Sequence, residues 1–372
     1  MSIKLFHSGD NFYNSALEDI KSANHSIKIE MYKFNLNGIG QNFAHELIEK
    51  AKSGLDIAIL VDGVGSKNFG GAMHIKMLAS GIKIKIYHPI PWQFHQFKHA
   101  VSTLPTIKKM FYLFAKINTR NHRKVIIIDD KILYLGSINI SNDHISQTKK
   151  PAWSDCAIRL IDSSAAEIAT TAFNRAFSPD LKNIYQGFQQ TIASKHNIIL
   201  NNNLVKRQQN FRRLLKKIKK SQTRIWLVSA YFAPNNTLLK ALISAASRGV
   251  DVKLILPKSS DIAFMNLAAK YFYGVLLQSN IKIYEHSPTM IHSKYMLIDN
   301  WAMVGSSNLN HRSIMHDLEI DFQCTKPSFI NKLEQMFIKD KSHSNKISCY
   351  LYKSNWFARL LFRFVCSFRI VL

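Results

Sequence analysis

Short apolar runs alternate with amphipathic stretches along this chain, and the second half repeats the order of the first. In the first half the segments 16–20 and 43–52 follow helical spacing, whereas 26–32 and 54–62 read as strands. In the second half the corresponding helices are 211–220 and 238–247, and the corresponding strands are 224–231 and 248–256. Helices alternating with strands predict an α/β fold in which helices cover a mixed or mostly parallel sheet. The repetition predicts two such domains.

We place the first domain at residues 1–185 and the second at 190–345. A chain of 372 residues is long enough for two domains with substantial cores. The halves differ by an insertion of 29 residues at about 91–119, which holds six aromatic residues and no acidic residue. Its composition indicates either a helical flap that packs on its own domain or a basic, aromatic lip beside a binding site. Such a lip would suit a lipid headgroup region or stacked bases.

The most specific pattern is a motif, H-x-K-x-x-x-x-D, that occurs twice, 170 residues apart. Its copies contain His122, Lys124 and Asp129, and His292, Lys294 and Asp299. In each copy a strand-like apolar run separates the lysine from the aspartate, and the sequel Gly-Ser-x-Asn follows. Two copies with the same sequel are hard to explain by chance and indicate a site built twice.

Residues two apart on a strand share a face, so the histidine and lysine of each copy point the same way. Two facing half-sites would present two imidazoles and two ammonium groups to one anionic centre. The sequels add Ser137, Asn139, Ser306 and Asn308, from which we expect substrate contacts. This set suits phosphodiester chemistry, because charge on the non-bridging oxygens must be neutralised in the transition state.

The duplicated motif resembles that of the phospholipase D superfamily, over roughly residues 1–345. Within the superfamily the chain is most similar to bacterial cardiolipin synthases, on the segments 60–63, 121–129, 153–155 and 231–234. The resemblance implies two mixed sheets flanked by helices, related by a pseudo-twofold axis around one shared active site, so that a monomer suffices. It implies a phosphatidyltransferase that moves a phosphatidyl group between glycerophospholipids. The first sequel, Gly-Ser-Ile-Asn, departs from the Gly-Gly common among relatives.

In the implied mechanism one histidine attacks phosphorus to form a phosphohistidine, while the other protonates the leaving alcohol and deprotonates the acceptor. The resemblance alone favours His122 as the nucleophile and His292 as the acid and base. It also implies an acidic residue that orients the imidazoles. The matching positions are Asp155 and Glu319, with Asp317 as an alternative to Glu319.

Asp129 and Asp299 complete the catalytic motifs, although we expect them to brace hairpin turns rather than to contact substrate. No carboxylate cluster is present, and the four cysteines have no metal-ligand spacing. With so much fixed positive charge at the site, we expect neither a metal nor a cofactor. The cysteines also suggest no disulfide framework, which favours a reducing, cytosolic compartment.

The net charge of +26 predicts attraction to a polyanion, either an anionic membrane or nucleic acid. The sequence begins without a signal peptide and has no apolar stretch of membrane-spanning length. We therefore expect a peripheral protein on the cytoplasmic face of the cell membrane. Three rival functions remain: a lipid hydrolase of phospholipase D type, a phosphodiesterase acting on nucleic acid, and an inactive binding protein.

The last segment, 346–372, lies outside the duplication and is rich in aromatic residues. Arg359 and Arg363 share one helical face opposite a broad apolar surface. This pattern predicts an amphipathic helix that lies in the membrane interface, with a helix packed on the protein body as the alternative.

Overall fold

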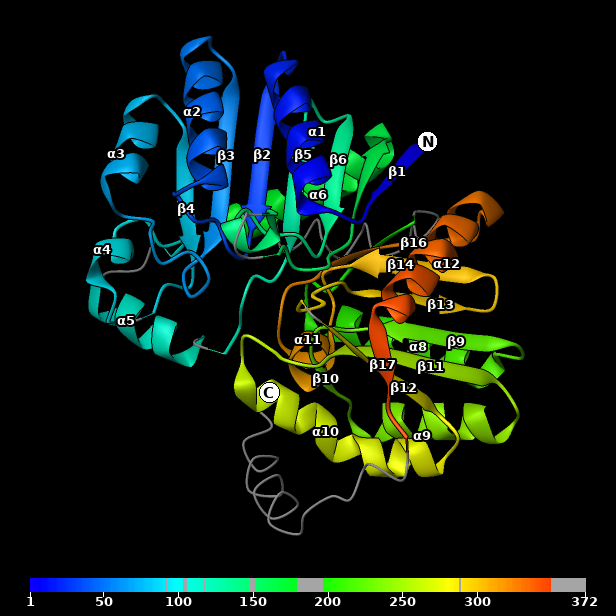
Figure 1. The fold of residues 1–372 in the computed structure, drawn as a ribbon. Helices are drawn as coiled ribbons and strands as arrows, with labels where there is room; N and C mark the ends of the chain where they lie inside the picture. Colours follow the sequence, from blue (N-terminus) through cyan, green and yellow to red (C-terminus); the bar gives the residue numbers. More distant parts are fainter. Residues whose placement is uncertain are drawn as a thin grey trace.

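The computed structural model describes residues 1–90, 92–102, 106–116, 118–146, 151–178, 197–287 and 289–348. Two mixed β-sheets form its framework, and each is built by one half of the chain (Figure 1). The strands of the first half are β1 (Ser2–Phe6), β2 (Ser26–Met31), β3 (Asp56–Asp62), β4 (Lys83–Tyr87), β5 (Lys124–Ile128), β6 (Ile132–Gly136) and β7 (Ala157–Ile161). They lie in the order β1-β7-β6-β5-β2-β3-β4.

The second sheet repeats this order with one additional edge strand. Its strands are β8 (Ile198–Leu200), β9 (Arg224–Val228), β11 (Asp251–Pro257), β12 (Lys282–His286), β13 (Tyr295–Ile298), β14 (Trp301–Gly305), β16 (Ile320–Cys324) and β17 (Ser344–Lys346). They lie in the order β17-β12-β11-β9-β13-β14-β16-β8. A separate pair, β10 (Phe232–Ala233) and β15 (Leu309–Asn310), is parallel. The predicted duplicated α/β fold is confirmed.

Helices pack on both sheets, most of them on the outer faces and one long helix of each half in the core between the sheets. Those of the first half are α1 (Gly9–Lys21), α2 (Ile39–Lys52), α3 (Ala72–Ala79), α4 (Phe94–Phe97), α5 (Thr106–Ala115), the short 3-10 helix η1 (Asn142–His144) and α6 (Ser163–Phe177). Those of the second half are α8 (Leu204–Lys220), α9 (Asn236–Ser247), α10 (Ala263–Gln278), α11 (His311–Met315) and α12 (Pro327–Ser342). Among the described residues, no helix is both long and apolar enough to cross a membrane.

Strand direction follows from the connections. The pairs β2–β3 and β3–β4 are parallel because a helix connects each pair, whereas β5, β6 and β7 form an antiparallel meander. The same alternation holds in the second half. The motif strands β5 and β13 therefore occupy the same central place in each sheet, each beside the first parallel strand of its half.

One apolar core is shared by the two halves and lies between their sheets. In β5, Val125 and Ile127 belong to this shared core, whereas Ile126 and Ile128 belong to a separate core under the outer helices. Both faces of the strand are covered, which is why its sequence is a continuous apolar run. Burial of each such isoleucine contributes about 1.5–3 kcal/mol. The shared core holds the two sheets in a fixed relation, so residues at their facing ends meet.

The insertion at 91–119 contains α4 and α5, which lie beside α3 and β4 at the left of Figure 1. The boundary that we placed between the domains, 185–190, and most of the terminal segment 346–372 lie outside the described residues.

Candidate phosphodiester site

The two motif histidines immediately precede the two central strands. Lys124 begins β5, and Lys294 directly precedes β13. The side chains of His122, Lys124, His292 and Lys294 are all buried. Each lysine Nζ donates a 2.6 Å hydrogen bond to the backbone carbonyl of the histidine two residues before it. Histidine and lysine of each motif are thereby held together on one strand edge, as the spacing predicts.

The backbone of each motif is joined to the other half of the chain. The amide of His122 donates to the carbonyl of Leu318 at 3.0 Å, and the amide of His292 donates to the carbonyl of Ser154 at 2.7 Å. Leu318 and Ser154 each directly precede one of the two predicted orienting carboxylates. The two halves therefore exchange their acidic residues.

The exchange fixes the partners of both imidazoles. His122 Nδ1 lies 3.0 Å and 3.1 Å from the two carboxylate oxygens of Glu319. His292 Nδ1 lies 2.9 Å from Asp155 Oδ2. Each carboxylate thus holds a histidine of the other half by Nδ1, which turns Nε2 away from the carboxylate. Nε2 of His292 lies 3.1 Å from Lys294 Nζ, the lysine of its own motif. The alternative residue Asp317 is paired with Arg312 at 3.1 Å and lies away from this role.

The serines of the two sequels have a different place from the one predicted. The hydroxyl of Ser137 donates to Asp155, and the hydroxyl of Ser306 donates to Glu319. Both serines are fully buried. Because their protons are engaged by the carboxylates, the structure does not support direct substrate contact. The serines position the two carboxylates, which in turn orient the histidines.

The asparagines of the sequels contact His144 and Ser313, which are partners of the same two carboxylates. Asn139 Oδ1 accepts the amide of Lys33 at 3.2 Å. The side-chain oxygen of Asn308 is buried and has no hydrogen-bond partner among the described residues. The backbone amide of Asn308 donates to the hydroxyl of Ser313 at 3.2 Å, and the backbone amide of Asn139 donates to Nε2 of His144 at 3.4 Å.

The aspartates that close the motifs lie at the far ends of the strands. Asp129 accepts the backbone amides of Asn24, His25 and Ser26 at 2.8–2.9 Å. Asp299 accepts three backbone amides of residues 222–224 in the same way. Both adopt positive φ, 52° and 48°. They brace the turns that follow β5 and β13, so their place in the catalytic motif is structural.

Burial and neighbouring cations set the ionisation of the histidines. Burial, followed by Lys124 and Lys294, holds the pKa of His122 well below its usual range. Burial and Lys294 likewise lower the pKa of His292, against the opposing effect of Asp155. Burial also lowers the pKa of Lys294 to about 8. Burial and the lysines therefore disfavour the protonated form of both imidazoles, and the influence of Lys294 on His122 indicates that the half-sites adjoin.

The two carboxylates differ in charge. Burial raises the pKa of Asp155, but His292 and His144 outweigh it and hold this pKa well below its usual range. Burial raises the pKa of Glu319 to about 7, despite Lys124 and the hydroxyls of Ser306 and Ser313.

Sequence reasoning missed His144 and two tyrosines. His144 Nδ1 lies 2.8 Å from the same Asp155 oxygen that binds His292. Tyr32 has its ring centroid 5.0 Å from that of His122, and Tyr231 lies 6.3 Å from His292. The duplication could have revealed the tyrosines, since each follows the first parallel strand of its half. His144 has no counterpart in the second half, where Ser313 stands, and no repeated pattern marks it.

One group of side chains has the composition of a metal site. Ring nitrogens of His144 and His292 and a carboxylate oxygen of Asp155 all lie within 4.8 Å of one another. Both histidines direct Nδ1 at the same carboxylate oxygen. A metal there would have to replace two close contacts that already satisfy these groups, so the trio fits a hydrogen-bonded cluster better than a ligand set.

A duplicated α/β fold whose halves exchange carboxylates behind two histidine–lysine pairs is the architecture of the phospholipase D class. The family model described as "Cardiolipin synthase, PLD-like domain" matches residues 16–175 and 214–341, and the chain belongs to this family.

Similar proteins point the same way. The chain is 30% identical over 362 residues to cardiolipin synthase 1 of Staphylococcus epidermidis, which covers 94% of this chain and 70% of that protein. It is 28% identical to cardiolipin synthase B of Salmonella typhi, over 85% of this chain and 75% of that protein. The crystal structure of phosphatidylserine synthase from Haemophilus influenzae has the same fold, with a TM-score of 0.67 and 14% identity over 100% of this chain and 95% of that one. The chain is thus a phosphatidyltransferase-type enzyme of the phospholipase D superfamily.

Proposed function

We propose that this enzyme transfers a phosphatidyl group from one glycerophospholipid to a hydroxyl of another, as a cardiolipin synthase does, through a phosphohistidine. The observation that carries the proposal is the pair of buried histidines, each with Nδ1 held by a carboxylate from the other half. An imidazole fixed in this way directs the lone pair of Nε2 at the substrate.

In the first step, His122 Nε2 attacks phosphorus and forms an N–P bond. The P–O bond to the leaving alcohol breaks, and His292 Nε2 gives that oxygen its proton. In the second step, His292 takes a proton from the acceptor hydroxyl, whose oxygen attacks phosphorus and breaks the N–P bond. Lys124 and Lys294 neutralise the non-bridging oxygens in both transition states.

The assignment of the two histidines follows from their carboxylates. An acid must carry a proton when the leaving group departs, so it needs a fixed negative charge behind it. Asp155 remains ionised, whereas the pKa of Glu319 lies near 7. This difference favours His292, which Asp155 supports, as the acid and base. The negative charge of a bound phosphodiester further favours the protonated form of His292.

A membrane is the partner that the surface favours. On α5, Ile107, Met110, Phe111 and Phe114 are exposed at helical spacing i, i+3, i+4 and i+7, while Leu113 faces inward. An apolar stripe that faces solvent from a segment without acidic residues suits an anionic lipid surface. We propose peripheral attachment through this stripe and through the amphipathic segment 346–372.

Purified protein incubated with phosphatidylglycerol vesicles, and separately with single- and double-stranded DNA, tests the function. Cardiolipin and glycerol as products would support transfer. Phosphatidic acid alone would replace transfer by hydrolysis, and cleaved DNA with untouched lipid would end the lipid proposal. Trapping of radiolabelled phosphatidyl on His122, absent in His122→Ala, would support the intermediate.

A further inference from the structure

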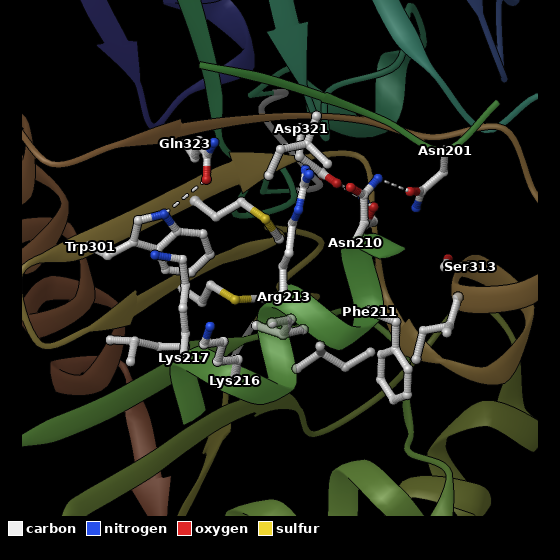
Figure 2. A pocket seen from close by; sticks show the side chains of 18 of the residues that line it. Asn201, Asn210, Phe211, Arg213, Lys216, Lys217, Trp301, Ser313, Asp321 and Gln323 are labelled. Carbon is white, nitrogen blue, oxygen red and sulfur yellow. Dashed lines mark hydrogen bonds between the residues drawn. The ribbon is translucent and has the colours of Figure 1, made fainter. Parts of the chain in front are cut away.

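A cavity of about 540 Å³ lies between α8 and the outer face of the second sheet. Its apolar wall includes Met296, Ile298, Trp301, Met303 and Leu214. Figure 2 shows Trp301 and Lys217 at one end and Asn201 and Ser313 at the other. The cavity therefore runs along β13 and β14 toward the half-site of His122, because Ser313 is a hydrogen-bond partner of Glu319.

The first half has a packed core at the corresponding place. There Phe6, Phe12 and Tyr134 form a cluster with ring centroids 5.5–6.2 Å apart, between α1 and its sheet. All three rings are buried. Aromatic side chains of this size fill the space between a helix and a sheet to the density of an ordinary protein interior.

Strand register identifies the residues that replace these rings in the second half. Phe6 pairs with Ala157, whose partner on the other side is Gly136. Ile199 pairs with Asp321, whose partner on the other side is Gly305, so Ile199 corresponds to Phe6. Tyr134 on β6 corresponds to Met303 on β14, and Phe12 corresponds to Asn210, which is equally far before the next strand. The replacements Ile199, Asn210 and Met303 all line the cavity. The cavity occupies the space that three rings fill in the other half.

The charges around this cavity have one dominant sign. Five cations of α8 line it: Arg207, Arg213, Lys216, Lys217 and Lys220. Lys217 Nζ lies 4.6 Å from the centre of the Trp301 ring, so a cation stands beside the apolar wall. The acidic groups of the lining are already engaged, since Asp299 accepts three backbone amides and Asp321 accepts the hydroxyl of Ser307 at 2.6 Å.

We propose that this cavity binds one acyl chain of an anionic amphiphile, with the anionic head on the cations of α8. An apolar cavity of this volume is within the range of small-molecule sites, and a cationic rim selects a negatively charged head. The choice of a lipid rests on the proposed function. The ligand is a free fatty acid or a chain of a bilayer phospholipid, which share this chemistry.

Fluorescence of Trp301 provides the test, because bromine atoms quench an indole ring that they contact. Dibrominated stearic acid is titrated into the full-length protein, and phosphatidylglycerol vesicles with dibrominated chains form a second arm. We expect quenching that disappears in Trp301→Phe. Met303→Tyr, which restores the aromatic residue of the first half, should weaken binding about tenfold or more, while the matched control Met303→Leu should change it less than about threefold.

The role of the anionic head is tested with the methyl ester of the brominated acid, which has no charge. The wild type should bind the ester several-fold more weakly than the acid, whereas Lys217→Gln should bind the ester and the acid equally. Absence of Trp301 quenching in both arms would overturn the proposal. Binding that Met303→Tyr does not weaken would also overturn it, provided that Met303→Tyr and Met303→Leu both unfold at the wild-type temperature. Lipid transfer is measured on the same samples. Transfer without quenching removes the cavity proposal alone, and quenching without transfer removes the proposed reaction alone.

Discussion

The two half-sites have the same backbone but different polar partners. In one, Asp155 holds His292, receives the hydroxyl of Ser137 and also contacts His144. In the other, Glu319 holds His122 and receives the hydroxyls of Ser306 and Ser313. Imidazoles can become cations and hydroxyls cannot, so the first carboxylate stays charged and the second approaches neutrality at pH 7. Duplication preserved the geometry while the neighbours of each carboxylate set a different charge.

This comparison separates the roles of geometry and electrostatics. If position alone mattered, corresponding substitutions in the two halves would have equal effects. If the charge of the carboxylate matters, the half with Asp155 should be more sensitive, and only the half with Glu319 should respond to pH near 7.

The largest effect should come from the histidines themselves. His122→Ala and His292→Ala should each lower turnover by at least about 10³-fold, because each removes one member of the nucleophile and acid pair. Lys124→Ala and Lys294→Ala should be nearly as severe. Transfer from phosphatidylglycerol measures the loss, and circular dichroism verifies the fold. More than a tenth of wild-type activity in either histidine variant would refute the two-histidine mechanism.

The carboxylates should differ in their effects. Asp155→Asn should lower turnover about 10²–10³-fold at every pH, because the fixed charge behind His292 is lost. Glu319→Gln should cost about tenfold at pH 8 and less at pH 6, where Glu319 is already protonated in the wild type. A pH–rate profile of both variants decides the matter. Equal losses with parallel profiles would show that the two half-sites are electrostatically equivalent.

The insertion is another difference between the halves, and it should affect membrane binding more than chemistry. Phe111→Asp and Phe114→Asp place charges in the exposed stripe of α5 and should weaken binding to anionic vesicles about tenfold. Vesicle flotation measures binding. Lys108→Gln serves as a control that leaves the stripe intact, and activity on detergent-dispersed lipid should survive in all three. Unchanged flotation would assign attachment to another surface.

The sequence was informative where the determinants are local. The spacing of His122 and Lys124 along one strand predicts that they act together, and Asp129 was expected as a brace because a turn follows it. The family resemblance predicted the acidic positions Asp155 and Glu319, with Asp317 as an alternative to Glu319, by their place after the sequel. The sequence did not predict that each carboxylate binds the histidine of the other half. That contact depends on how the two sheets meet across the shared core, and no local pattern encodes it.

The orientation of two serines and the presence of the cavity were also not predicted, because both depend on contacts between distant parts of the chain. Ser137 and Ser306 were expected to contact substrate, since a strand pattern does not tell which way a hydroxyl turns when a carboxylate lies 18 or 13 residues further along the chain. The cavity was invisible because methionine at 303 and tyrosine at 134 satisfy the same apolar pattern. Only the packed neighbours reveal that a ring is missing.

Thermal unfolding should show opposite signs for the two carboxylates. The pKa of Glu319 is raised to about 7 in the folded protein. Folding stability therefore falls as pH rises from about 4 to 7, because this carboxyl ionises in the unfolded chain while the buried group stays protonated, and it is constant above that. Glu319→Gln should therefore raise Tm by about 2–4 °C at pH 8 and leave it unchanged at pH 5.

Asp155 has a lowered pKa, so its contribution is present above about pH 4 and is lost only as pH falls through the folded-state value. Asp155→Asn should lower Tm by a similar amount at pH 5 and pH 8. A stabilised Asp155→Asn protein at pH 8 would contradict the difference in charge that separates the half-sites.

The smallest effect should be that of chelation. His144, Asp155 and His292 form the one described cluster with the composition of a metal site. Because Nδ1 of both histidines is directed at the same carboxylate oxygen, we expect the functional state to be hydrogen-bonded, and activity should survive excess EDTA. Added Zn²⁺ should instead inhibit by competing for these nitrogens, and His144→Ser, which copies the second half, should require more Zn²⁺ for the same inhibition. Loss of activity in EDTA that a divalent ion restores would make the trio a metal centre, and the difference between the half-sites would then be one of ligation rather than of hydrogen bonding.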